Sequence, residues 1–126
     1  MEKKTEIKRY QLAEEGLQTN MVREFEVAYG ISKHEMADLM GISEKTYYNL
    51  LLKDKLDRER SDRFLFIEKI FEEGEETFTS KQNFNRWLRL PHPSLGNQKP
   101  IDLLDSLNGA QAVHAEIIRT RHNVLS

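Results

Sequence analysis

FNRWLRLPHPSLGNQKPIDLL, residues 84–104, contains the only tryptophan and all three prolines of the chain. Phe84, Trp87 and Leu88 recur at i, i+3 and i+4, which predicts a helix with one apolar face. Pro91 lacks a backbone N–H and disfavours helical geometry at Leu90, so we expect this helix to end there. Trp87 and Leu88 are therefore expected to be core residues.

A fixed turn and a second helix follow in the same stretch. We expect the turn to include Leu95 and Gly96, and Pro100 suits the first position of a helix, where a missing N–H costs nothing. Apolar residues at helical spacing predict the buried face of this second helix: Ile101, Leu104 and Leu107. On pattern alone, this is an ordinary helical corner of a small core.

Composition limits the class of protein. The chain has 126 residues, 38% apolar and 32% charged, which fits one domain or two small helical subdomains. It has no apolar run of membrane-spanning length and no signal-peptide pattern, so we expect a cytoplasmic protein. The absence of cysteine excludes disulfides, a thiol nucleophile and a cysteine-ligated zinc site.

The charge is balanced along the chain. The formal net charge is −2, with 12 Lys+Arg against 13 Asp+Glu in residues 1–63 and 7 against 8 in residues 64–126. A non-specific nucleic-acid binder would be strongly basic. Any nucleic-acid binding must therefore come from a local patch.

The first part of the chain predicts two helices. Residues 1–20 indicate a short helix ending near Gly16, and a stripe of apolar residues then predicts a packed helix that Gly30 ends. The stripe consists of Met21, Phe25, Ala28 and Tyr29.

Two short helices joined by a tight glycine turn are predicted next. Ser32 and Glu35 have the spacing of a capping box, and Gly41 ends the helix that they begin. Ser43 is the N-cap of a second helix, residues 44–51. This is the helix-turn-helix pattern of DNA-binding proteins.

The second of these helices carries the candidate DNA contacts. With Tyr47 and Leu50 turned inward, polar residues face outward. Asn49 could pair with adenine, Lys45 could reach guanine or a phosphate, and Thr46 could touch a thymine methyl group. The predicted DNA-binding residues are Ser43, Glu44, Lys45, Thr46, Tyr48, Asn49 and Lys53. A unit that is only structural or binds protein stays open as the alternative, and DNA binding would imply a homodimer.

A longer helix should follow from the charged segment 57–63. Its predicted buried face is Phe64, Ile67, Ile70 and Phe71, and Gly74 is expected to end it. The polar run 72–77 then predicts a linker between a helix-turn-helix domain, residues 1–74, and a second domain, residues 75–126. Ser80 is the expected N-cap of the helix that bears Trp87.

The last helix is expected from Ala110 to about Arg121, with Ala110, Val113 and Ile117 on its buried face and Asn108-Gly109 forming the turn before it. The end, RTRHNVLS, is basic and then apolar; a frayed terminus is one interpretation.

No catalytic or metal-binding pattern is found. The histidines do not form i, i+4 pairs, and no phosphate loop or nucleophile elbow occurs. We expect no enzyme activity, no metal and no cofactor.

Three segments in order carry a family resemblance: MADLMGISEKTYYNLL, the SDR of residues 61–63, and WLRLPHPSLGNQKPIDLLDSLNGAQAV. Together they resemble the Xre/MbcA/ParS class of type II antitoxins over about residues 30–122. The most specific part matches the toxin-binding motif of that family, which includes Trp87, Leu88, Pro91, Leu95, Gly96, Pro100 and Leu104. Asn97 stands where a second glycine is common, and it must adopt a left-handed conformation.

The resemblance implies an all-α, dimeric antitoxin that represses its own operon and neutralises a toxin of the RES class, which destroys NAD. It also implies that the C-terminal residues occlude the active site of that toxin. On this basis the expected toxin-binding residues are Arg119, Arg121, His122, Asn123, Val124 and Leu125. The alternative is a stand-alone helix-turn-helix repressor without a toxin partner.

Overall fold

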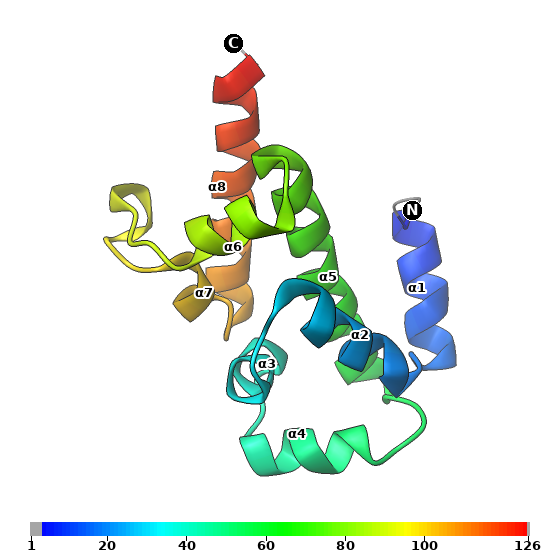
Figure 1. Ribbon diagram of the computed structural model, residues 1–126. Helices are drawn as coiled ribbons and strands as arrows, with labels where there is room; N and C mark the ends of the chain where they lie inside the picture. Colours follow the sequence, from blue (N-terminus) through cyan, green and yellow to red (C-terminus); the bar gives the residue numbers. More distant parts are fainter. Residues whose placement is uncertain (1–3, 126) are drawn as a thin grey trace. The chain divides into compact units, whose positions relative to one another are not determined.

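The computed structural model describes residues 4–125, without the side chains of residues 124 and 125. This part of the chain is all-α, as predicted, and holds no β-strand. The elements in order (Figure 1) are α1 Glu6–Glu15, α2 Thr19–Tyr29, α3 Lys33–Met40, α4 Glu44–Leu51, α5 Arg58–Phe78, α6 Lys81–Leu88, the 3-10 turn η1 Pro93–Leu95, α7 Pro100–Leu103 and α8 Leu107–Leu125.

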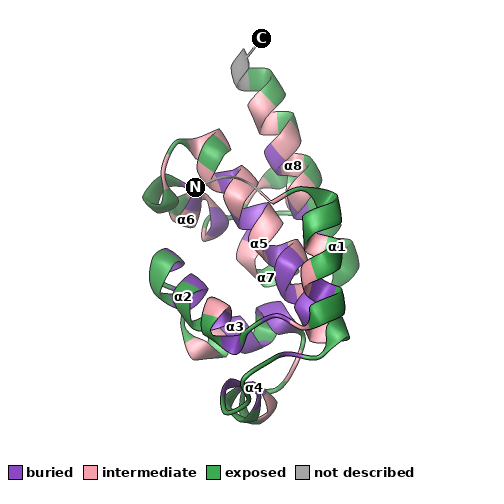
Figure 2. Ribbon diagram, turned by 90° about the vertical axis from the view of Figure 1, so that its right-hand side faces the viewer, coloured by how far each residue is buried: buried purple, intermediate pink, exposed green. Residues whose placement is uncertain are grey.

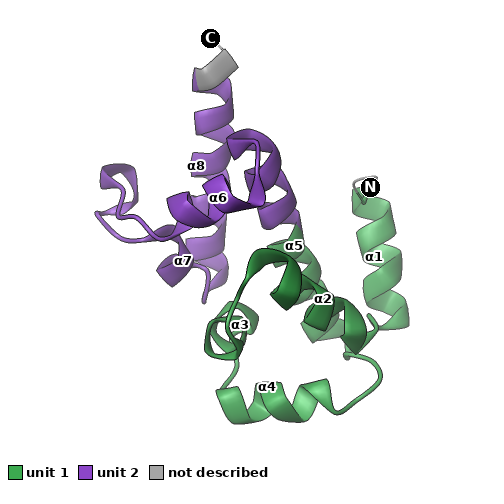
Figure 3. Cartoon of the chain, in the orientation of Figure 1, with its two compact units in different colours: residues 1–68 green, residues 69–126 purple. Residues whose placement is uncertain are grey.

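The chain forms two compact units, residues 1–68 and residues 69–126 (Figure 3). The division falls within α5, which contributes its first half to unit 1 and its second half to unit 2. Each unit has its own buried apolar residues. The assignment of separate functions to residues 1–74 and 75–126 stays a prediction.

The core of unit 1 is formed by α2, α3, α4 and the first half of α5, whose buried positions are purple in Figure 2. The Phe25 ring meets the Phe64 ring edge to face, with centroids 5.3 Å apart. The predicted stripe of α2 was partly wrong: Val22 is buried, whereas Met21 is half-buried and Ala28 is exposed. The buried face of α2 thus consists of Thr19, Val22, Phe25, Glu26 and Tyr29.

The loop after α1 is fixed to α5 by a buried serine. Ser61 is fully buried, and its hydroxyl accepts a hydrogen bond from the backbone N–H of Leu17 at 2.9 Å. The N–H of Leu56 donates to the Leu17 carbonyl at 2.8 Å. Since buried backbone groups need partners, these bonds fix the loop that precedes α2. The predicted end of α1 at Gly16 is confirmed.

The predicted linker at residues 72–77 and the predicted helix end at Gly74 were wrong, because α5 continues without a break to Phe78. Gly74 lies inside the helix, where an added Cβ would overlap the ring of Phe84. Glycine is therefore present at this position for close helix packing and not as a helix stop. The helix that follows has the predicted N-cap, since Ser80 accepts from the backbone N–H of Asn83.

The core of unit 2 contains the predicted apolar residues of α6 and α8. Phe71 and Phe84 pack edge to face with centroids 5.2 Å apart. The other fully buried side chains of this core are those of Ile70, Leu88, Leu104, Ala110, Val113 and Ile117. Leu107 is 54% exposed, so its prediction as a core residue was wrong.

The predicted turn at Asn108-Gly109 was also wrong, because both residues lie in the first turn of α8. A Cβ at Gly109 would overlap the carbonyl oxygen of Leu103, so glycine allows α7 and α8 to approach closely. At its other end, α8 continues to Leu125, beyond the predicted end at Arg121.

Candidate functional site

The caps of α3 and α4 set the geometry of the helix-turn-helix. Ser32 and Glu35 form both hydrogen bonds of the capping box, at 3.1 and 3.2 Å. Gly41 ends α3 in the left-handed conformation, with φ 70°, and Ser43 caps α4 by accepting from the Thr46 N–H at 3.1 Å. The predicted unit of two helices and a tight turn is therefore confirmed.

The orientation of α4 divides its residues into two faces. Tyr47 is fully buried, and Leu50 and Leu51 are also buried. The opposite face carries most of the residues predicted to contact DNA: Glu44, Lys45, Tyr48 and Asn49 are exposed, and so is Lys53 in the loop that follows. The structure thus brings the amide, ammonium and carboxylate groups of these residues to one side of α4.

Ser43 and Thr46 use much of their hydrogen-bonding capacity within the cap. The Ser43 hydroxyl donates to Thr46 Oγ1 at 2.9 Å while it accepts from the Thr46 backbone. In the free protein, the hydroxyl groups of Ser43 and Thr46 therefore fix the start of α4. Thr46 is half-buried, and its methyl group is the part of this side chain that can make an apolar contact.

A buried polar network holds α4 against α2 and α3. The Tyr47 hydroxyl donates to the carboxylate of Glu26, which is 9% exposed. Lys33 Nζ lies 2.6 Å from the same carboxylate. Burial and, to a smaller extent, the Glu26 carboxylate raise the pKa of the Tyr47 phenol well above its ordinary value. The sequence pattern marked Tyr47 as apolar and gave no sign of its charged partner.

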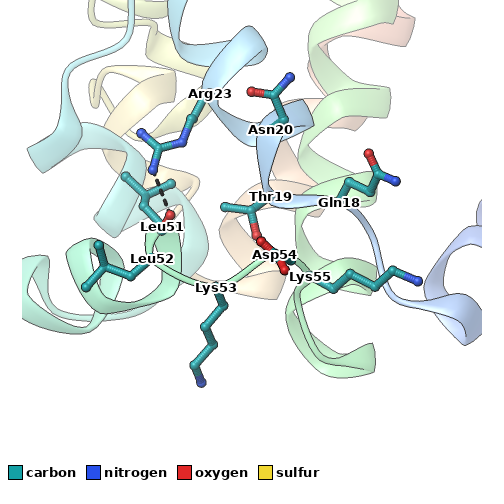
Figure 4. A pocket seen from close by; sticks show the side chains of 9 residues that line it. All are labelled: Gln18, Thr19, Asn20, Arg23, Leu51, Leu52, Lys53, Asp54 and Lys55. Atoms are coloured by element: carbon teal, nitrogen blue, oxygen red, sulfur yellow. Dashed lines mark hydrogen bonds between the residues drawn. The ribbon is translucent and has the colours of Figure 1, made fainter.

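A pocket of about 420 Å³ lies where the end of α4 meets the start of α2 (Figure 4). Arg23 of α2 reaches across it and donates to the Leu51 carbonyl at 2.6 Å. The N–H of Thr19 donates to the Asp54 carbonyl at 2.9 Å. These bonds fix the loop after α4, whose exposed residues Lys53 and Lys55 line the same pocket.

His34 of α3 contacts the first residue of α4. Its Nδ1 lies 2.8 Å from a carboxylate oxygen of Glu44, and its Nε2 lies 3.6 Å from Asp38. All three side chains are more than half exposed. Nothing in the sequence pattern indicated the contact with Glu44, because ten residues and a turn separate it from His34.

The corner of unit 2 is built around Trp87 and His92. His92 Nε2 lies 3.0 Å from the Trp87 carbonyl, and the two rings are 4.9 Å apart. Gly96 and Asn97 both have left-handed backbones, with φ 66° and 62°, as predicted for Asn97.

The motif residues of unit 2 differ in how far they are buried. Leu88, Leu104 and Pro100 are buried as expected, Leu95 is half-buried and Pro91 is exposed. Trp87 is only half-buried, so its expected place inside the core was partly wrong.

The end of α8 holds the residues that were expected to bind a toxin. Arg121 donates to Thr77 Oγ1 at 3.0 Å and to the Glu73 carbonyl at 3.1 Å. It therefore binds α8 to α5 within unit 2. Arg119 pairs with Glu116 and is mostly exposed. His122 and Asn123 are exposed as well, and the side chains of Val124 and Leu125 lie outside the described part of the chain.

Within residues 4–125, no helix has the length and apolar character needed to cross a bilayer. Within the same residues, no three acidic or histidine side chains gather in a group that could hold a metal ion.

Comparison with known proteins agrees with this geometry. Residues 8–67 match the antitoxin Xre-like helix-turn-helix domain, and residues 73–122 match the antitoxin Xre/MbcA/ParS C-terminal toxin-binding domain. A protein of Sphingobium sp. (strain YBL2), named Prs ADP-ribosylating antitoxin, is 28% identical over 117 residues, which cover 85% of this chain and 74% of the relative. A toxin-binding domain implies a toxin as partner, and the helix-turn-helix implies DNA binding. The chain belongs to the Xre/MbcA/ParS family of antitoxins.

Proposed function

We propose that this antitoxin neutralises a RES-type, NAD-degrading toxin by occluding its active site, and that as a homodimer it represses its own operon. The single observation that supports the proposal best is the match of two family domains to one chain, one with an exposed polar face on α4 and the other ending in α8.

The DNA-binding part of the proposal rests on the exposed face of α4. A helix of this kind places its first residues in the major groove, where Asn49 can pair with adenine and Lys45 can reach guanine or a phosphate. Lys53 lies beyond the helix, where a backbone phosphate would be in reach. One recognition helix reads only a few base pairs, so we expect two copies to bind half-sites about 34 Å apart.

The toxin-binding part rests on the polar end of α8. Ile117 is the last buried residue of this helix in the described part of the chain, and α8 continues beyond it for two more turns. Arg119 and His122 are exposed there and could donate hydrogen bonds to carboxylates that line the active site of the toxin. ADP-ribosylation uses NAD as its donor, so the name of the Sphingobium relative supports a toxin that acts on NAD.

DNA binding can be tested with a fragment from the protein's own promoter. We expect the wild type to retard this fragment at low salt and the double variant Lys45→Ala, Asn49→Ala to lose retardation. Lys99→Ala with Asn108→Ala is the matched control, because both residues are exposed and lie in unit 2. A wild-type protein that ignores the fragment at low salt would contradict operator binding.

Occlusion of the toxin can be tested by co-expression with the neighbouring gene product. The double variant Arg119→Glu, His122→Glu keeps the bonds of Arg121 and should therefore fold normally, but it should no longer inhibit NAD degradation. Lys8→Glu in exposed α1 is the charge control. If the double variant inhibits as well as the wild type does, the end of α8 does not occlude the active site.

A stand-alone repressor is the second candidate function, since the helix-turn-helix alone would support it. Such a protein would bind its promoter tightly, purify without a partner and leave the activity of the neighbouring gene product unchanged.

A further inference from the structure

Glu44 occupies the position of α4 at which a DNA-binding helix enters the major groove. An unpaired carboxylate at this position would be repelled by the phosphates on both sides of the groove. Asp38 adds a second exposed carboxylate nearby, on α3. The structure places one imidazole, that of His34, between these two acids.

Both ring nitrogens of His34 face an acidic side chain. A carboxylate can only accept hydrogen bonds, so at 2.8 Å the His34 Nδ1 must donate to Glu44. Nε2 lies 3.6 Å from Asp38, which is within ion-pair distance but too far for a good hydrogen bond. An imidazolium therefore satisfies both contacts, whereas a neutral ring pairs well with only one.

We propose that His34 is a positioning residue for DNA recognition: it holds Glu44 for base readout, and its protonation offsets the negative charge that Glu44 and Asp38 bring to the DNA. The inference rests on the proposed binding of operator DNA by α4. With one oxygen of Glu44 held by His34, the other can accept from the amino group of cytosine. Proton uptake changes the charge of the three side chains from −2 to −1, so operator affinity rises as the pH falls.

Other charged groups near His34 are occupied elsewhere. Lys33, the next residue, is turned toward Glu26 on α2, and Glu35 accepts from the N–H of Ser32 in the capping box. Among the side chains that the structure describes, those that face the imidazole within ion-pair distance are Asp38 from its own helix and Glu44 from α4. Histidine is the ordinary side chain that changes charge between pH 5 and 8, and His34 is the only histidine in residues 1–68.

Two substitutions of His34 imitate its two charge states. His34→Gln keeps a neutral hydrogen-bonding side chain, and His34→Lys keeps a positive charge at every pH of the test. The experiment measures the affinity of the full chain for its promoter fragment at pH 6.0 and pH 8.0, at one fixed salt concentration. Thermal unfolding of each variant checks that these exposed substitutions leave the fold intact.

For the wild type we expect binding about five- to tenfold tighter at pH 6.0 than at pH 8.0. His34→Gln should bind weakly at both pH values, and His34→Lys should bind at both as tightly as the wild type does at pH 6.0. Glu44→Gln should also reduce the pH dependence, because the carboxylate that holds the imidazolium is gone.

Two results would overturn the inference while leaving operator binding intact: equal wild-type affinity at both pH values, or an unchanged pH dependence in His34→Gln. A wild-type protein that fails to bind the fragment at either pH and at low salt would overturn the proposed operator binding, and with it this role of His34.

Discussion

The Tyr47 hydroxyl of α4 donates a hydrogen bond to the Glu26 carboxylate of α2, inside unit 1. Lys33 of α3 pairs with the same carboxylate, so one buried acid connects α2, α3 and α4, the last of which carries the predicted DNA contacts. A buried charge is tolerated only when it is paired and hydrogen-bonded. Changes to this network should therefore affect the stability of unit 1 before they affect any contact with DNA.

The first prediction concerns the Tyr47 hydroxyl. Tyr47→Phe removes a buried donor to a charged acceptor and should lower the free energy of unfolding by about 1–3 kcal/mol. Tyr48→Phe is the matched control, because Tyr48 is 52% exposed, and should change stability by less than about 0.5 kcal/mol. Urea denaturation measures both variants. Equal stability of the two would show that the Glu26 contact contributes nothing.

The second prediction follows from the raised pKa of Tyr47. The folded state holds the phenol proton more tightly than the unfolded state does, so the stabilisation is complete below the ordinary tyrosine pKa of about 10 and is lost as the pH rises above it. Urea denaturation between pH 8 and pH 11 should show a steeper loss of stability for the wild type than for Tyr47→Phe. Parallel curves would contradict the prediction.

The third prediction concerns Gly74. Alanine in the middle of a helix gains about 1 kcal/mol over glycine, but here the Cβ meets the Phe84 ring, and overpacking costs about 1–3 kcal/mol. Gly74→Ala should therefore destabilise the protein. In a Phe84→Leu background the same change should be neutral or stabilising, because the ring edge is gone. A double-mutant cycle by thermal unfolding measures this coupling, and additive effects would show that the two residues do not interact.

The sequence predicted the helix-turn-helix well because its signals are local. Ser32, Glu35, Gly41 and Ser43 each act within a few residues, through a cap or a left-handed turn. The same holds for Pro100, which begins α7. Capping chemistry depends on neighbours along the chain, so it can be predicted without knowledge of the tertiary fold.

The errors arose where a residue acts through a distant neighbour. Gly74 and Gly109 were interpreted as helix breakers, but each is needed because another element lies too close for a side chain. In the same way, His34 meets Glu44, Glu26 meets Tyr47 and Arg121 meets Thr77, and each of these partners comes from another helix. A pattern of helical spacing contains no information on these contacts, since they depend on how the helices pack.

The fourth prediction separates two arginines at the end of α8. Arg121 makes two hydrogen bonds to α5, so Arg121→Ala should lower the stability of the protein by about 1–2 kcal/mol. Arg119 is 59% exposed and pairs with its helical neighbour Glu116, and pairs of this kind within one helix contribute little, so Arg119→Ala should leave stability within about 0.5 kcal/mol. Thermal unfolding of the free antitoxin measures both.

In inhibition assays with the neighbouring gene product, by contrast, Arg119→Ala should have the larger effect and Arg121→Ala the smaller. Arg119→Ala should weaken toxin inhibition in a fully folded antitoxin, because its guanidinium is exposed near the end of α8. Arg121→Ala should weaken inhibition only as far as it loosens the attachment of α8 to α5. Low temperature, which favours the attached state, should then restore inhibition. Equal losses of inhibition at low temperature would instead place Arg121 in direct contact with the toxin, which requires it to leave Thr77 and Glu73 when the complex forms.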